Sequence, residues 1–97
     1  MKIVPGKMAE AMKLMKDWNA AIARLGMNPK NMRMYRRVTG QGDTMNTLIG
    51  EYEWDSLADM ASFFEKMFAD PEMQKQMANW SSVTESHEVE LYMQMPG

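Results

Sequence analysis

Residues 51–80 read EYEWDSLADMASFFEKMFADPEMQKQMANW, and the clearest signals of the fold lie in this segment. It predicts the end of a strand that runs into a capped helix, followed by a second helix. Asp55 or Ser56 can accept hydrogen bonds from the first N–H groups of the helix, which have no partner within it. Asp59 lies three residues after Ser56, which is the spacing of a capping box. We therefore expect the helix to begin directly after Ser56.

The predicted helix has one apolar face and ends at a kink. Its apolar residues recur at intervals of three and four, as on the buried side of a helix. They are Leu57, Met60, Ala61, Phe64, Met67 and Phe68. Asp70 can then cap a second helix that begins at Pro71. Proline suits this first position because it lacks the N–H group that a first helical turn leaves unpaired. Met73, Met77 and Trp80 continue the apolar stripe, so we expect about 14 residues before the kink and about nine after it.

A longer amphipathic helix is expected over residues 7–25, after a short strand at residues 2–4. Its apolar positions are Met8, Ala11, Met15, Trp18, Ile22 and Leu25. Gly26 suits the position just past the helix, because glycine adopts a left-handed backbone without strain. Pro29 prevents any continuation of the helix.

Three further segments alternate in the manner of strands: residues 31–39, residues 44 or 45 to 54, and residues 83–94. Residues 40–43 form the hairpin loop between the first two. The order β-α-β-β-α-β predicts a ferredoxin-like α+β fold, a single domain over residues 1–97 with both helices on one face of an antiparallel sheet. Apolar residues also fall on the other face of the strands, so we expect a second subunit to cover it.

The composition excludes several classes of protein. The chain has 97 residues, no cysteine and a net charge of −2, which excludes disulfides, thiolate catalysis and zinc–thiolate sites. No apolar run is long enough to span a membrane and no signal peptide is expected, which favours the cytoplasm. Residues 1–50 carry nine Lys and Arg against three acids, whereas residues 51–97 carry two against ten. The acidic total argues against a nucleic-acid partner, and the uneven distribution suggests that the two halves face each other.

Five segments of the chain resemble the dimeric α/β-barrel superfamily, and within it the small NIPSNAP-like and antibiotic-biosynthesis-monooxygenase-like domains. They are Val4–Lys7, the Arg36–Tyr52 hairpin, Glu53–Ser56, Asp70–Glu72 and Glu88–Tyr92. The resemblance implies a homodimer in which two sheets pack face to face, with a ligand pocket between each sheet and its helices. Relatives usually have a longer first strand than this chain.

Three residues are candidates for proton transfer. His87, the only histidine, lies in phase with apolar residues of the last predicted strand, and imidazole titrates near neutral pH. The competing interpretation is a hydrogen-bonded histidine with a structural role. Tyr35 and Tyr52 are the other two candidates, and both can instead be ordinary packing aromatics.

Aromatic residues are candidates for a ligand pocket: Trp54, Phe64, Phe68 and Trp80. Such side chains line the pockets that take small apolar molecules. They also form cores and subunit interfaces, which is the alternative for each of them.

Two charged groups are predicted to lie on opposite edges of the sheet. Arg33, Arg36 and Arg37 belong to one edge strand, and Glu85, Glu88 and Glu90 to the other. Opposing these edges across a dimer would pair the charges and close the exposed edges. The three arginines also suit a phosphate or carboxylate ligand. The three glutamates point to different faces of their strand, so no metal site is expected.

The superfamily resemblance also suggests chemistry. Its haem-degrading members carry an asparagine on the first strand, a tryptophan on the second helix and a histidine on the second segment of that helix. This chain has none of the three at those positions, so we expect neither that activity nor a cofactor. The expected function is binding of a small, largely apolar molecule between sheet and helices. The alternatives are a cofactor-independent monooxygenase-like or isomerase-like enzyme for a small aromatic or quinone-like substrate, and a module that only binds a partner.

Overall fold

The longest helix forms close to its predicted bounds. The computed structural model describes residues 1–40 and 45–96 of the chain. Helix α1 spans Met8–Arg24 and buries Ala11, Met15, Ala21 and Ile22 on one side. Gly26 follows it with a φ angle of 117°, which confirms the predicted left-handed stop.

The capped restart at Asp70 is confirmed. Helix α2 spans Leu57–Ala69, and the Ser56 side chain accepts a hydrogen bond from the Asp59 N–H group at 3.0 Å. Helix α3 spans Pro71–Trp80, and the Asp70 carboxylate accepts a hydrogen bond from the Met73 N–H group at 3.1 Å. Each cap satisfies an N–H group that its own helix leaves unpaired.

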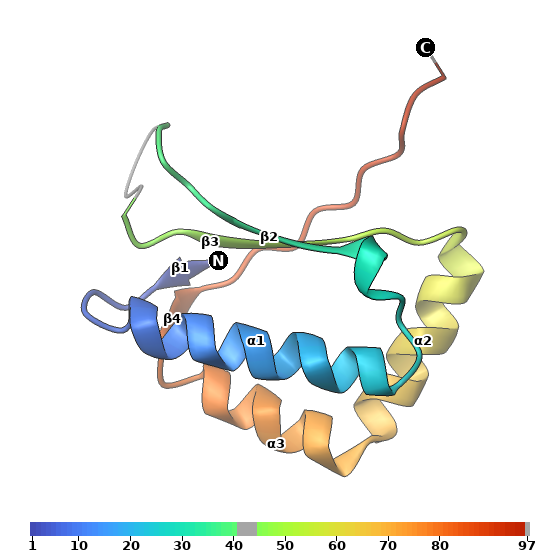
Figure 1. Ribbon diagram of the computed structural model, residues 1–97, viewed down its shortest axis with the longest axis horizontal. Coiled ribbons are helices and arrows are strands. Elements are labelled where there is room, and N and C mark those ends of the chain that lie inside the picture. The colour runs from blue at the N-terminus through green and yellow to red at the C-terminus, as the bar shows by residue number, and fades with distance from the viewer. Residues whose placement is uncertain (41–44, 97) are drawn as a thin grey trace.

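The strands form two small antiparallel sheets, and all three helices lie on one side of them (Figure 1). Strand β1 (Lys2–Ile3) pairs with β4 (Thr84–Ser86), and β2 (Met32–Arg36) pairs with β3 (Leu48–Tyr52). A bridge between Lys2 and Thr47 joins the two sheets. Two further hydrogen bonds support it, from the Ile3 N–H group to the Asn46 carbonyl at 2.7 Å and from the Leu48 N–H group to the Met1 carbonyl at 2.9 Å.

The strands on either side of the hairpin are shorter than predicted. Residue 31 belongs to a 3-10 turn, η1 (Pro29–Asn31), because the Asn28 side chain caps that turn. Of the predicted hairpin loop, residues 41–43 lie outside the described part of the chain, as does residue 44, where the next strand was predicted to begin.

The last strand forms, but it is much shorter than the predicted residues 83–94. Only Thr84–Ser86 pair with a neighbour, and residues 87–96 lie exposed and extend away from the body of the molecule (Figure 1). The register explains this. Lys2 lies opposite Ser86, so residue 87 comes level with Met1, and the residues after it have no β1 residue beside them. A strand needs a neighbour to satisfy its backbone, whatever its sequence pattern.

Two clusters form the core between the strands and the helices. The first consists of Ile3, Ala11, Met15, Leu48 and Val83, and the second of Ala21, Ile22, Met27, Met67 and Met73. Helix α2 contributes only Met67 as a buried residue, whereas Leu57 and Phe68 of its predicted apolar face remain 70% and 55% exposed. This part of the prediction is wrong, because α2 lies beside the end of α1, where no described element covers its outer side (Figure 1).

Candidate functional site

A pocket of about 350 Å³ lies where the end of β3 meets the end of α1 and the start of α2. Its lining residues are Gly26, Met27, Asn28, Asn31, Glu53, Trp54, Asp55, Asp59 and Phe63. We refer to it as the Trp54 pocket.

The local chemistry of three turns builds this pocket. Gly26 turns the chain after α1, and the Asn28 side chain then accepts a hydrogen bond from the Lys30 N–H group at 3.0 Å. The Glu53 N–H group donates to the Asn31 carbonyl at 2.9 Å, which fixes the end of β3 beside η1. The Ser56 cap begins α2 immediately afterwards, so that residues of its first two turns face the pocket.

Trp54 and Phe63 form the aromatic side of the pocket. Their ring centroids lie 5.4 Å apart with an interplanar angle of 53°. Trp54 is one of the residues predicted for a pocket. Phe63 is a residue that the sequence pattern missed, because it lies beside the apolar face of α2 rather than on it.

The other aromatic residues predicted for a pocket lie outside this lining. Phe64 makes an edge contact with Trp54 at 5.6 Å and an interplanar angle of 75°. Phe68 contacts Phe64 at 6.0 Å and is 55% exposed. Trp80 packs against the first core cluster. Phe64 supports the wall from outside, and Trp80 supports the core.

Three carboxylates line the Trp54 pocket: those of Glu53, Asp55 and Asp59. Glu53 accepts a hydrogen bond from the Arg33 guanidinium at 2.5 Å, and this contact raises the pKa of Arg33. Among the described residues, the carboxylates of Asp55 and Asp59 have no ion-pair partner. No lysine or arginine belongs to the lining, so its charge is negative.

The structure does not bring the three proton-transfer candidates together. The Tyr52 hydroxyl is partly buried, donates a hydrogen bond to the Asn19 side-chain oxygen at 3.0 Å, and has its pKa raised by burial to about 12. Tyr35 pairs with Ile49 on the opposite face of the sheet. His87 lies in the exposed C-terminal segment. None of them lines the Trp54 pocket or the groove described next.

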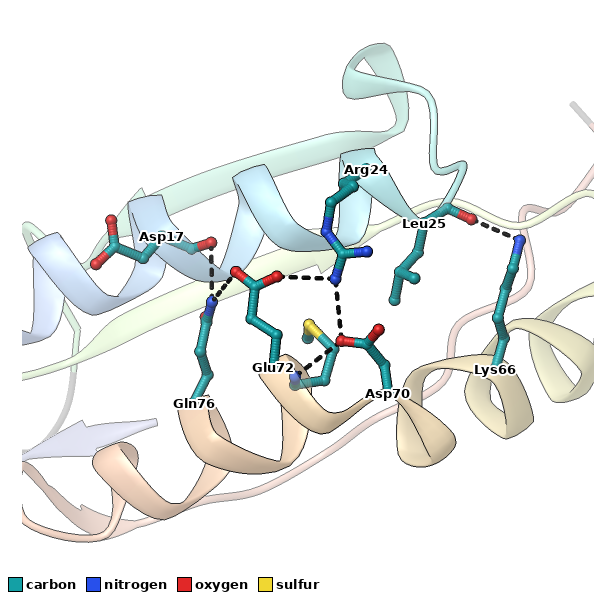
Figure 2. Close-up of polar contacts among 8 residues, drawn as sticks. Asp17, Arg24, Leu25, Lys66, Asp70, Glu72 and Gln76 are labelled. Atoms are coloured by element: carbon teal, nitrogen blue, oxygen red, sulfur yellow. Dashed lines mark hydrogen bonds and ion pairs between the residues drawn. The ribbon is translucent and has the colours of Figure 1, made fainter.

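A groove of about 430 Å³ lies between α1 and α3. Arg24 bridges it by donating to Asp70 at 3.0 Å and pairing with Glu72 at 2.8 Å (Figure 2). The Gln76 amide nitrogen donates to the Asp17 carbonyl at 3.5 Å and to Glu72 at 3.4 Å. These contacts join the two helices, so the polar groups of the groove serve mainly in packing.

Most of the charged residues predicted for the sheet edges have partners within the chain. Arg33 pairs with Glu51 at 3.3 Å as well as with Glu53, and Arg36 donates to the Met45 carbonyl at 3.3 Å. Glu85 lies 3.9 Å from the Lys2 ammonium. Glu88 and Glu90 belong to the exposed C-terminal segment, where Glu90 accepts a hydrogen bond from the Tyr92 hydroxyl.

Comparison with known proteins gives no relative: no family model, no curated protein and no solved structure matches this chain. In residues 1–40 and 45–96, no helix has both the length and the apolar character needed to cross a membrane.

Proposed function

We propose that this chain binds a small, largely apolar molecule in the Trp54 pocket. The observation that carries the proposal is a concave site of about 350 Å³ whose lining includes Trp54, Phe63 and the buried Met27. Ligand sites usually combine this size with apolar walls and a few polar groups. The pocket also lies at one end of the layer between the strands and the helices, where a ligand is expected from the sequence.

Binding agrees with the geometry better than catalysis does. A general acid or base has to reach the substrate directly or through one water molecule. His87, Tyr35 and Tyr52 line neither the Trp54 pocket nor the groove between α1 and α3. A monooxygenase-like or isomerase-like reaction therefore has no supporting contact among these three residues.

We propose a ferredoxin-like arrangement of the four strands, as in the dimeric α/β-barrel superfamily. The Lys2–Thr47 bridge supports the spatial order β4-β1-β3-β2, and every pairing in that order is antiparallel. The helices on one side of the strands agree with this arrangement (Figure 1).

We further propose that the chain works as a homodimer. Tyr35 and Ile49 lie opposite each other on the sheet face away from the helices and are 44% and 42% exposed. The C-terminal segment adds Val89, Leu91 and Met93, whose exposed fractions lie between 66% and 85%. Large apolar side chains left exposed on a sheet face and on an unpaired segment are typical of surfaces that another chain covers.

The backbone and the charges support the same assembly. On either side of β3, Arg37 donates to the Thr47 carbonyl and Asn31 accepts from the Glu53 N–H group. The alternate residues of β2 therefore direct their N–H and C=O groups toward the outer edge. That edge is basic, whereas the C-terminal segment is acidic. In the proposed dimer, the segment of one copy lies along β2 of the other.

A fragment screen followed by NMR tests the binding proposal. Fragments that bind should shift the amide signals of Trp54, Phe63 and Asn31 in a saturable way. Trp54→Leu should abolish these shifts, whereas Phe68→Leu, outside the pocket, should leave them intact. If fragments bind only at other surfaces of the folded protein, the proposal is wrong.

A further inference from the structure

We infer that the ligand of the Trp54 pocket carries a positive charge on a small organic group, such as a substituted ammonium. This inference rests on the proposed function and adds the chemical class of the ligand. It follows from the way the aromatic rings and the carboxylates share one pocket.

The aromatic side of the pocket suits a cation. The faces of Trp and Phe rings carry partial negative charge and attract an ammonium group within about 6 Å of the ring centre. Trp attracts cations more strongly than Phe does. The ring of Phe63 lies at an angle to that of Trp54, with the two ring centroids 5.4 Å apart. Two rings at an angle can contact one rounded alkylammonium group from two directions.

Three carboxylates give the pocket lining a negative charge, and those of Asp55 and Asp59 are exposed to solvent. Arg33 forms an ion pair with Glu53, but Asp55 and Asp59 have no ion-pair partner among the described residues. Lys66 lies beside Gly26 and donates to the Leu25 carbonyl at 2.8 Å, but it is not a lining residue. A bound cation would interact with both free carboxylates, whereas an anion would be repelled by them.

Helix capping does not account for both aspartates. A carboxylate in the first turn stabilises a helix, and Asp59 occupies such a position in α2. However, Ser56 provides the side-chain cap of α2, and Asp55 precedes it. Among the described residues, Asp55 accepts no capping hydrogen bond, although it lines the pocket.

The geometry favours an organic cation over a metal ion. A metal needs several oxygen ligands converging within about 2–2.6 Å. Across residues 1–40 and 45–96, no three His, Asp or Glu side chains lie close enough to form such a set. The lining instead surrounds a volume of about 350 Å³ and includes two aromatic rings, which agrees with a larger and weakly hydrated organic cation.

A pair of probes of equal shape tests the charge. Choline and 3,3-dimethylbutan-1-ol differ mainly in the charge of the head group, since a carbon atom replaces the nitrogen. Each would be titrated into the full chain at low salt, with binding followed from the NMR signals of Trp54 and Phe63. We expect choline to bind at least about tenfold more tightly than the neutral alcohol, and added salt to reduce the difference.

Variants assign the effect to the pocket. Asp55→Asn and Asp59→Asn should each weaken choline binding several-fold, and by a larger factor than they weaken binding of the alcohol. Asp17→Asn is the matched control, because it removes the same charge in the groove between α1 and α3. Circular dichroism would verify that each variant is folded.

The outcomes separate this inference from the function on which it rests. If both probes shift the pocket signals equally, the charge inference is wrong and the binding of a small molecule in the Trp54 pocket stands. If the alcohol binds and choline does not, the same conclusion follows. If neither probe shifts these signals at any concentration, both proposals are contradicted.

Discussion

Arg24 donates a hydrogen bond at 3.0 Å to the Oδ2 atom of Asp70, the same oxygen that caps α3 (Figure 2). A single carboxylate therefore starts α3 and ties it to the end of α1. The Asp70 side chain is 17% exposed, whereas that of Arg24 is 50% exposed. The two contacts of this oxygen should therefore differ in strength.

Replacing Asp70 should destabilise the protein more than replacing Arg24. Asp70→Ala removes a helix cap and should lower the free energy of unfolding by about 1–2 kcal/mol. Arg24→Ala removes an exposed ion pair and should lower it by about 0.2–1 kcal/mol. Urea unfolding of both variants and of the double variant measures these values. Equal losses in the two single variants would show that the cap contributes little.

Met73 should be the most sensitive methionine of α3. Its side chain is fully buried in the second core cluster, so Met73→Ala should lower the free energy of unfolding by about 2–5 kcal/mol. Met95→Ala, at a residue 77% exposed, is the control and should change it by less than about 0.5 kcal/mol. Similar effects of the two substitutions would contradict the described packing of α3 against α1.

Tyr52 should make the fold sensitive to high pH. Burial raises its pKa from the ordinary 10 to about 12, so the unfolded chain loses this proton first. The contribution of Tyr52 is fully present below pH 10 and falls between pH 10 and pH 12, by roughly 2 kcal/mol. Unfolding at a series of pH values measures the fall. Tyr52→Phe should reduce the slope in this range, and an unchanged slope would exclude Tyr52 as its cause.

The features predicted correctly from the sequence depend on neighbours in the chain. The caps at Ser56 and Asp70 and the glycine stop at Gly26 each need only a few consecutive residues. The features predicted wrongly depend on distant residues. The alternating pattern of residues 87–94 indicates a strand, but pairing also needs an adjacent strand of equal length, and β1 is two residues long.

The candidate site could be predicted only in part, for a related reason. Trp54 is identified by its place between the strand and the capped helix. Phe63 lines the pocket because of how α2 is rotated against the end of β3, and a periodic pattern does not specify that rotation. Asp55 and Asp59 are interpreted from sequence as capping residues, so their position in a pocket lining is not predicted.

Dimer formation should depend on the sheet face away from the helices. Ile49→Lys and deletion of residues 87–96 should each raise the dimer dissociation constant at least about tenfold, because each removes exposed apolar area. Reversing the charge of Arg33, Arg36 and Arg37 together should also raise it. Sedimentation velocity over a range of concentrations measures the constant.

Leu57→Lys is the control for these dimer variants. Leu57 is 70% exposed on α2, outside the proposed interface. A wild-type chain that sediments as a monomer at every concentration would contradict the homodimer. So would a dimer that weakens only with Leu57→Lys.

The fluorescence of Trp54 alone tests whether the Trp54 pocket binds a small molecule. Trp18→Phe and Trp80→Phe together leave Trp54 as the only tryptophan, and circular dichroism would verify the fold. Titration with small apolar and cationic compounds should change the Trp54 emission along a saturable curve for at least one compound. Binding in the Trp54 pocket is contradicted if none of the compounds changes the emission of the folded protein while the same compounds bind elsewhere on the chain.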